Sequence, residues 1–472
     1  MKQTPWLAFS FDRHSDQPIF EQICEAIRAR TISGELAEGT KLPPTRVFAT
    51  ELGVSRSTVV TAYEQLVAEG YLHGVRGSGY TVCAVGELTH SAAPPVPDQN
   101  EVQTEERPRP LPFEASQPDM RLFPHRQWAK TVSRICRANP ESMLLGGEAF
   151  GNFELRRAIA AHVSEWRGIT ATPQQILVTA GATDALEVCL RTLTRAGDQV
   201  ALEDPGYRPM SHFAQAQGLE QVLLDIDDSG ACLPAAQSAP KAAILTPSHQ
   251  YPLGGAMSPS RRLEFIQWAE TNKAWIIEDD YDSEFRYSGR PIPAMAGFDH
   301  LNRTIYIGSF SKIFSNALRL GYVILPDALS DGFRATMRRF GLKASYMPQQ
   351  ALAEFIHSGE FYRHLRRVRR IYGDRRKHLL DRLTREFSAY GSFTDHQAGM
   401  QVVFHLNAPF QDAKIVAKAR MLGITVDALS DYTIRASDAN GLILGFCGYT
   451  VEEMDAALDL LKNSVFQKVD RV

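Results

Sequence analysis

Apolar positions follow two different patterns along this chain. In the first eighty residues they recur three or four positions apart, as at Phe20, Ile23 and Ile27, which is typical of amphipathic helices. After residue 113, helical patterns alternate with short apolar runs, which occupy 176–179, 199–202, 242–245, 275–278, 304–307 and 321–324. Strands that alternate with helices form a largely parallel sheet, so we expect an α/β domain. Two later runs, at 401–406 and 442–446, predict a smaller α+β lobe.

A change in composition separates the two patterns. Residues 84–112 are rich in proline and charge and poor in aromatic side chains. Such a segment is typical of an extended, semi-rigid linker. We therefore expect a first module at 1–83, a linker at 84–112 and a large domain at 113–472.

The first module has the order of a winged helix-turn-helix. A short second helix runs past Phe48 to Leu52 and ends at Gly53, after which Ser55 caps a third helix. Two short strands around residues 70–72 and 77–82 would then form a wing. In a helix-turn-helix the helix after the turn enters the major groove of DNA.

The charge of the chain permits DNA binding without requiring it. The net charge is only −3, so the whole chain is not basic. Positive charge is local to the turn and the third helix, at Lys41, Arg46 and Arg56, with only Glu51 opposing it. On this pattern alone, a three-helix bundle with no role in DNA binding stays open.

Cysteine usage and hydropathy limit the compartment. The six cysteines lie far apart and form no CxxC pair, which argues against a zinc site or a disulfide scaffold. No secretory leader or apolar stretch of membrane-spanning length is evident. We expect a cytoplasmic protein with no metal site and no membrane partner.

The candidate chemistry of the large domain centres on Lys312, which lies between Ser309 and Ser311 and is followed by Arg319. A lysine amine can bind an aldehyde cofactor, and hydroxyls with an arginine can hold the phosphate of that cofactor. Asp279 follows an apolar run, where a carboxylate could face the ring nitrogen of the cofactor. Each motif alone is usually a surface feature; their order and their position at strand ends make the combination specific. The turn before a helix at Ala182 and Thr183 could add phosphate donors.

The first module resembles the winged helix-turn-helix of the GntR regulator family. The motifs that carry the resemblance are 42–46, 54–59, 62–66 and 69–71. It implies that the protein binds operator DNA. The residues expected to contact DNA are Arg46, Arg56, Ser57 and Thr58 and, in the wing, Gly77 and Ser78.

Residues 113–465 resemble a class I, fold-type I aminotransferase, and its fusion behind a GntR module resembles the MocR group of transcriptional regulators. The matching motifs are 203–207, 246–252, 277–285 and 308–312. The resemblance implies pyridoxal 5'-phosphate as cofactor. It assigns the Schiff base to Lys312, the ring nitrogen to Asp279, the ring hydroxyl to Tyr281, stacking on the ring to Tyr207, the phosphate to Ser309 and Arg319 with Ser311, Ala182 and Thr183, and the edge of the ring to His249 and Gln250.

Two positions depart from the pattern that the resemblance implies. Ile443 stands where aminotransferases often have an arginine that binds the substrate carboxylate; Arg435 or Arg208 could replace it. Segment 145–151 contains no tyrosine, although family members often place one there to reach the phosphate of the partner subunit. Both departures weaken the case for an efficient aminotransferase.

These observations predict a transcriptional regulator that depends on pyridoxal phosphate and senses a small amine, an amino acid or the cofactor itself. The resemblance implies a head-to-tail, domain-swapped homodimer. An aminotransferase with an attached DNA-binding head stays open as an alternative, with residual transaminase activity. Within the basic run 361–377, Arg363, Arg366, Arg367 and Arg370 share one helix face. That face is either solvated or contacts the DNA backbone.

Overall fold

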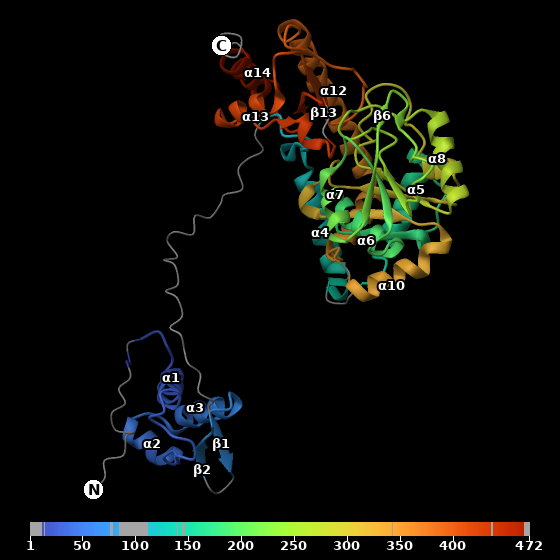
Figure 1. Ribbon diagram of the computed structural model, residues 1–472. Coiled ribbons are helices and arrows are strands. Elements are labelled where there is room, and N and C mark those ends of the chain that lie inside the picture. Colours follow the sequence, from blue (N-terminus) through green and yellow to red (C-terminus); the bar gives the residue numbers. More distant parts are fainter. Residues whose placement is uncertain are drawn as a thin grey trace. The chain divides into compact units, whose positions relative to one another are not determined.

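The computed structural model describes residues 12–13, 15–75, 79–84, 112–138, 140–143, 147–341, 343–435 and 438–466. Contacts divide the chain into two units, Met1–Glu106 and Arg107–Val472 (Figure 1).

The first unit is a three-helix module with a short two-stranded sheet. Its elements are α1 (Ile19–Ile32), α2 (Thr45–Leu52), α3 (Arg56–Ala68), β1 (Leu72–Val75) and β2 (Gly79–Val82). The two strands pair antiparallel. Gly53 ends α2 in the left-handed conformation at φ 62°, and the Ser55 hydroxyl caps α3 by accepting a hydrogen bond from Thr58 N at 3.1 Å. This order confirms the predicted winged helix-turn-helix.

A seven-stranded sheet forms the centre of the second unit. Its order is β3 (Ile176–Thr179), β11 (Gly321–Ile324), β10 (Thr304–Ser309), β9 (Trp275–Asp280), β8 (Ala242–Leu245), β4 (Gln199–Glu203) and β5 (Glu220–Leu224). Within it only β11 runs against its neighbours, β10 and β3. The predicted, largely parallel α/β sheet is confirmed.

Alternate side chains of these strands enter different cores. On one face Leu202 and Ile307 pack in a cluster with α6 (Ala182–Leu193) and α10 (Ser330–Phe340). On the other face Ile276 packs with Phe265 of α8 (Pro259–Asn272). Because both faces are covered, the strands appear in the sequence as continuous apolar runs rather than as alternating ones.

The remaining helices surround the sheet and extend to the C-terminal lobe. They are α4 (His125–Ala138), α5 (Phe153–Arg167), α7 (Arg208–Ala216), α9 (Met295–Phe298), α11 (Met347–His357), α12 (Glu360–Glu386), α13 (Asp412–Met421) and α14 (Val451–Leu460). The short helical turns are η3 (Met120–Leu122), η4 (Pro140–Met143), η5 (Pro173–Gln175), η6 (Asn316–Leu318), η7 (Asp327–Leu329), η8 (Leu429–Tyr432) and η9 (Leu461–Phe466). No helix in the described ranges is long and apolar enough to cross a bilayer.

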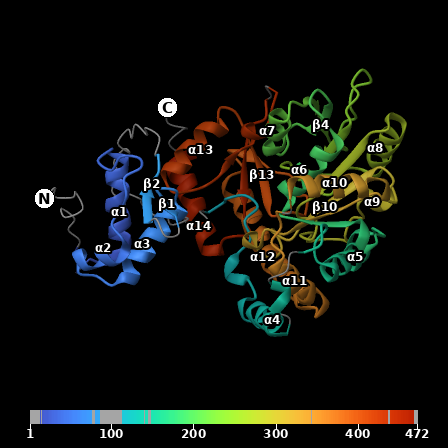
Figure 2. The same cartoon turned by 90° about the horizontal axis from the view of Figure 1, so that it is seen from below.

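The C-terminal part forms the predicted smaller α+β lobe. Its antiparallel sheet has the order β12 (Gly391–Ser392), β13 (Gln401–Leu406), β15 (Gly441–Gly445) and β14 (Asp427–Ala428). A separate two-stranded ribbon lies outside both sheets and consists of β6 (Ile226–Asp227) and β7 (Gly230–Ala231). Both views show the lobe, coloured orange to red, on one side of the large sheet (Figures 1 and 2).

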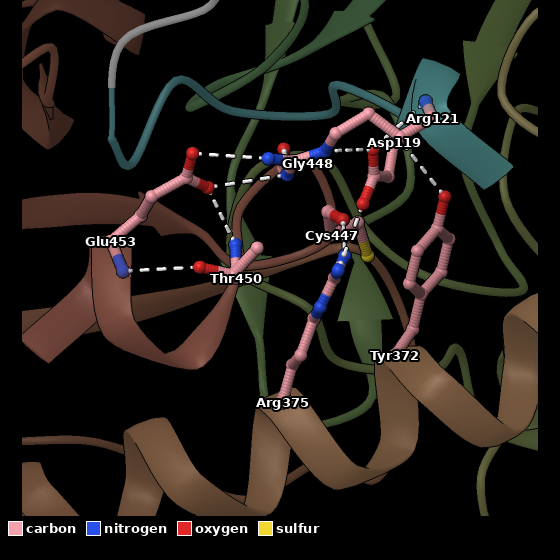
Figure 3. A network of polar contacts seen from close by, with 8 residues as sticks. All are labelled: Asp119, Arg121, Tyr372, Arg375, Cys447, Gly448, Thr450 and Glu453. Carbon is pink, nitrogen blue, oxygen red and sulfur yellow. Dashed lines mark hydrogen bonds and ion pairs between the residues drawn. The ribbon is translucent and has the colours of Figure 1, made fainter.

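A polar network fastens the start of the second unit to this lobe (Figure 3). The buried Asp119 carboxylate accepts hydrogen bonds from Arg375 of α12 at 2.8 Å and from Arg121 at 2.8 Å. Arg121 in turn pairs with Glu453 of α14 at 3.0 Å. Phe113, which precedes Asp119 in the chain, forms an isolated antiparallel β-bridge with Gly445 of β15. The segment that follows the predicted linker is therefore part of the lobe.

Candidate functional site

A cavity of about 550 Å³ opens where several strands of the large sheet end. One side of it, here called the sheet wall, consists of Ala182, Thr183, Asp279, Ser309 and Lys312. A second part of the lining, the small-lobe wall, consists of Glu114, Ala115, Ser116, Thr425, Asp427 and Tyr432. Residues from several separate stretches of the chain thus meet around one space, at the strand edge where α/β sheets place ligands.

Lys312 follows β10 by three residues and reaches across the cavity. Its Nζ donates a hydrogen bond to the carbonyl oxygen of Ser116 at 3.1 Å. Burial lowers the pKa of Lys312, whereas Asp282, Asp279 and Glu114 oppose the shift. Burial therefore favours the neutral amine, the form that acts as a nucleophile.

Asp279 lies near the end of β9 and is buried. Burial raises the pKa of its carboxyl group to about 7, and the nearby Asp280 and Glu203 add to the increase. Its Oδ1 has no hydrogen-bond partner among the described residues. A buried acceptor without a donor is costly, so this position is suited to a ligand that brings its own N–H or positive charge.

The third predicted group surrounds the N-terminus of α6. Gly181 precedes the helix at φ 101°, and no side chain caps the helix end. A Cβ on Gly321 would lie 2.8 Å from the Gly181 carbonyl carbon, so the start of β11 can approach the turn only as glycine. Ser311 and Arg319 also line the cavity here. Uncapped helix N–H groups beside hydroxyls and a cation form a suitable site for a phosphate.

These three features fit pyridoxal phosphate. The cavity contains an amine of lowered pKa, a buried carboxylate oxygen without a donor, and an uncapped helix N-terminus beside an arginine. They correspond to the aldehyde, the ring nitrogen and the phosphate of the cofactor.

The two predicted tyrosines line the cavity in different ways. Tyr207 is 37% exposed, and its hydroxyl lies 3.4 Å from the Thr183 hydroxyl. The Tyr281 hydroxyl is 2.8 Å from His249 Nδ1. Burial raises the pKa of Tyr281 well above the ordinary value. A neutral phenol held by a neighbouring imidazole can donate to, or accept from, a ligand in the cavity.

His249 and Gln250 lie behind the cavity rather than on its surface. The His249 ring is buried and its Nδ1 is 3.1 Å from the Asp282 carboxylate. Gln250 is buried too and donates to the Glu203 carboxylate at 3.2 Å. Neither residue is among those that line the cavity, and the prediction that they lie at the edge of a cofactor ring stays a prediction.

Sequence reasoning missed most of the small-lobe wall. Asp427 accepts a hydrogen bond from the Tyr432 hydroxyl at 3.1 Å, and the Tyr251 hydroxyl donates to that of Tyr432 at 3.4 Å. Burial raises the pKa of Asp427. These residues follow no apolar run of the large sheet, so no sequence signal connected them to Lys312.

Ile443 is fully buried and packs in an apolar cluster with Val403 and Leu429. Neither candidate replacement for a carboxylate-binding arginine reaches the cavity. Arg435 pairs with Asp204 at 3.2 Å and also with Asp225, and Arg208 donates to the Thr433 carbonyl at 2.6 Å. None of the described residues in segment 145–151 lines the cavity.

The predicted DNA-contacting residues lie around the start of α3 and on α2. Arg46, Arg56 and Ser57 are exposed, whereas Thr58 is half-buried. Neither arginine forms an ion pair within the described part of the first unit, and the Ser57 and Thr58 hydroxyls each lie 2.7 Å from Ser55 Oγ. Gly77 and Ser78 lie outside the described residues. Two cations free of internal partners can contact phosphates.

The basic run forms part of the long helix α12, and its cations divide into two groups. Arg375 and Arg376 are buried and pair with Asp119 and Asp395. The four arginines that were predicted to share one helix face are all exposed: Arg363, Arg366, Arg367 and Arg370. One of them, Arg363, pairs with Glu360. Part of the charge therefore serves the fold, and the other part faces solvent.

Two family models match the chain. The model for aminotransferase class I and II covers residues 116–461, and the model for bacterial regulatory proteins of the gntR family covers residues 19–82. Together they include both described units, so the head and the large domain each have a family of their own.

The curated relatives share both domains. The probable rhizopine catabolism regulatory protein MocR of Rhizobium meliloti is 34% identical over 467 residues, which is 96% of this chain and 95% of the relative. The HTH-type pyridoxine biosynthesis transcriptional regulator PdxR of Corynebacterium glutamicum is 33% identical, over 97% of this chain and 98% of the relative.

Two solved structures each match about three quarters of this chain. A kynurenine aminotransferase of Pyrococcus horikoshii superposes with a TM-score of 0.70 at 21% identity, over 77% of this chain and 92% of its own. The α-aminoadipate aminotransferase LysN of Thermus thermophilus has a TM-score of 0.68 at 25% identity, over 77% and 93%. The large domain thus has the fold of aminotransferases that use pyridoxal phosphate.

Proposed function

This chain belongs to the class I and II aminotransferase family and is a GntR-type transcriptional regulator of the MocR kind, and we propose that it couples a pyridoxal phosphate site at Lys312 to operator binding. The ligand sensed would be a small amine, an amino acid or the cofactor itself. We place the DNA-binding domain at 1–83, the linker at 84–112 and the sensing domain at 113–472 of a cytoplasmic protein.

The observation that carries the proposal is that one cavity is lined by Lys312 and by Asp279, whose Oδ1 has no hydrogen-bond partner among the described residues. Pyridoxal phosphate supplies an aldehyde for an amine and a ring nitrogen for a carboxylate. Lys312 would bind the first and Asp279 the second. Ser309, Ser311, Arg319 and the amides at Ala182 and Thr183 would hold the phosphate, while Tyr207 and Tyr281 would contact the ring.

The contact between Lys312 and Ser116 supports a route from the cavity to the DNA-binding domain. Ser116 lies just after the predicted linker, and its carbonyl accepts the Lys312 Nζ donor at 3.1 Å. A ligand that changes the partner of Nζ would change the hydrogen bonding of this segment. Any ligand that binds one arrangement of the segment more tightly shifts the equilibrium towards that arrangement.

On the DNA side, Arg46, Arg56, Ser57 and Thr58, with the wing at Gly77 and Ser78, would contact the operator. A head-to-tail homodimer would present two such domains to paired half-sites. Such an assembly makes operator affinity depend on the arrangement of both large domains.

The proposal is tested by measuring operator binding with the cofactor removed, restored, and restored together with candidate amines. We expect the cofactor to shift absorbance on binding and at least one addition to change operator affinity. Operator affinity that is equal under all three conditions would contradict sensing. Multiple turnovers with formation of a keto acid would instead favour the aminotransferase alternative, and a response to the cofactor alone would make it the sole ligand.

A further inference from the structure

The small-lobe wall differs in charge from the sheet wall. Its charged residues are Glu114 and Asp427, both acidic, and neither has an ion-pair partner among the described residues. The two cations that line the cavity, Lys312 and Arg319, already have places in the proposed cofactor site. The part of the cavity that remains for an effector is therefore acidic.

Asp427 occupies a defined position in this wall. It pairs directly with Ile443 across the antiparallel strands β14 and β15, so the two side chains project from the same face of the small sheet. Ile443 is fully buried in an apolar cluster and carries no charge to balance the carboxylate. A negative group on the ligand would thus meet an acid at this point and no cation.

The hydrogen bonds around Asp427 leave it able to accept more. The Tyr432 hydroxyl donates to Oδ2 at 3.1 Å, whereas Oδ1 has no donor among the residues that the structure describes. Arg420 influences the carboxylate electrostatically, but it forms no ion pair with it and does not line the cavity. A half-buried carboxylate with one open oxygen is a strong acceptor for an ammonium group.

We propose that the effector of this regulator is an amine whose far end carries a second cationic nitrogen, bound by Asp427 with Glu114, and that a carboxylate at that end is disfavoured. This inference rests on the proposed function, because it assumes that the first amine of the effector is directed at the Lys312 end of the cavity. The ligand class is then a diamine or a related polycation, which differs from an amino acid by one full reversal of charge at its far end.

Three five-carbon amines that differ only at the far end test the proposal: cadaverine (ammonium), n-pentylamine (methyl) and δ-aminovalerate (carboxylate). Isothermal titration of the full-length, cofactor-loaded protein would give their dissociation constants. We expect cadaverine to bind at least about tenfold more tightly than n-pentylamine and δ-aminovalerate to bind most weakly. The order within the wild-type protein needs no variant and cannot be confused with a folding defect.

The substitution Asp427→Asn adds a second readout, because asparagine can still accept the Tyr432 hydrogen bond. We expect the substitution to lower the affinity for cadaverine by about tenfold and to leave the affinity for n-pentylamine unchanged. Asp438→Asn is the matched control, since Asp438 is exposed and does not line the cavity.

Each outcome decides between the two proposals. Loaded protein that binds δ-aminovalerate as tightly as cadaverine, or that binds none of the three amines, overturns this inference alone. An Asp427→Asn variant with an unchanged ratio of cadaverine to n-pentylamine affinity does the same. Protein that retains no cofactor, as judged by its absorbance after gel filtration, overturns the proposed function and this inference with it.

Discussion

The two walls of the cavity at Lys312 were built under different constraints. The sheet wall holds an amine, a carboxylate and an uncapped helix end, each at the end of a strand or in the turn that follows it. The small-lobe wall holds two acids and Tyr432, and Tyr432 packs against the apolar cluster that contains Ile443. The difference teaches that one cavity can combine a part suited to an aldehyde that carries a phosphate with a part that carries negative charge.

Removing the amine would have the largest effect on this comparison. We expect Lys312→Ala to lose all covalently retained cofactor, because the sheet wall then has no amine for the aldehyde. Absorbance after gel filtration and dialysis measures the retention. Lys343→Ala is the control, since that exposed lysine pairs with Glu187 outside the cavity. A Lys312→Ala protein that stays as yellow as the wild type would refute the Schiff base.

The small-lobe wall depends on the network in Figure 3, and breaking that network should cost stability. Asp119→Asn leaves the buried Arg375 guanidinium without its carboxylate, so we expect the free energy of unfolding to fall by about 3 kcal/mol. Denaturant unfolding followed by fluorescence measures the change. Asp381→Asn, on the exposed face of the same helix, should change it by less than about 0.5 kcal/mol. Equal effects of both substitutions would mean that the network does not anchor the segment.

The carboxylate of the sheet wall should matter for the affinity of the cofactor. Asp279→Asn keeps the shape of the side chain but removes the charge that would face the ring nitrogen, so we expect cofactor affinity to fall between about tenfold and a hundredfold. Fluorescence titration of the cofactor-free protein gives the dissociation constant. Asp228→Asn, an exposed carboxylate in the same unit, serves as the control. Unchanged affinity in Asp279→Asn would place the ring nitrogen elsewhere.

The smallest effect is expected at Ile443, which should act only through packing. Ile443→Val removes one methylene group from the cluster with Val403 and Leu429, at a cost of about 1 kcal/mol in the free energy of unfolding. Cofactor affinity should stay at the wild-type value. A change in cofactor affinity larger than the change in stability would show that the small-lobe wall also contributes to cofactor binding, and the two walls would then no longer be separable.

The sequence indicated the fold because its signals were local. Gly53 and Ser55 mark the ends of neighbouring helices, and the apolar runs of the large sheet are buried on both faces, as at Ile276 and Ile307. Backbone conformation and burial of single strands depend on residues close together in the chain. Sequence patterns therefore predicted the winged helix-turn-helix and the mostly parallel sheet, although the edge strand β5 and the reversed direction of β11 carried no signal that was recognised.

The same reasoning explains which part of the candidate site could be found. Asp279 lies near the end of one recognisable strand, and Lys312 follows the strand beside it. Parallel strands place their carboxyl ends at one edge, so the two residues could be expected to meet. The positions of His249 and Gln250 could not be predicted in this way. Whether a side chain lines a cavity depends on its tertiary contacts, here those of His249 with Asp282 and of Gln250 with Glu203.

The sequence by itself determined the two domains, the strands that end near Lys312 and Asp279, and the apolar Ile443 at a position where the resemblance implies an arginine. Only the tertiary structure decided that Ser116 accepts a hydrogen bond from Lys312 and that Asp427 faces the same cavity. These residues lie about two hundred and one hundred positions from Lys312, and no periodic pattern connects them. They meet because the small lobe packs beside the large sheet, and packing between distant segments is fixed by the shape of whole surfaces rather than by neighbouring residues.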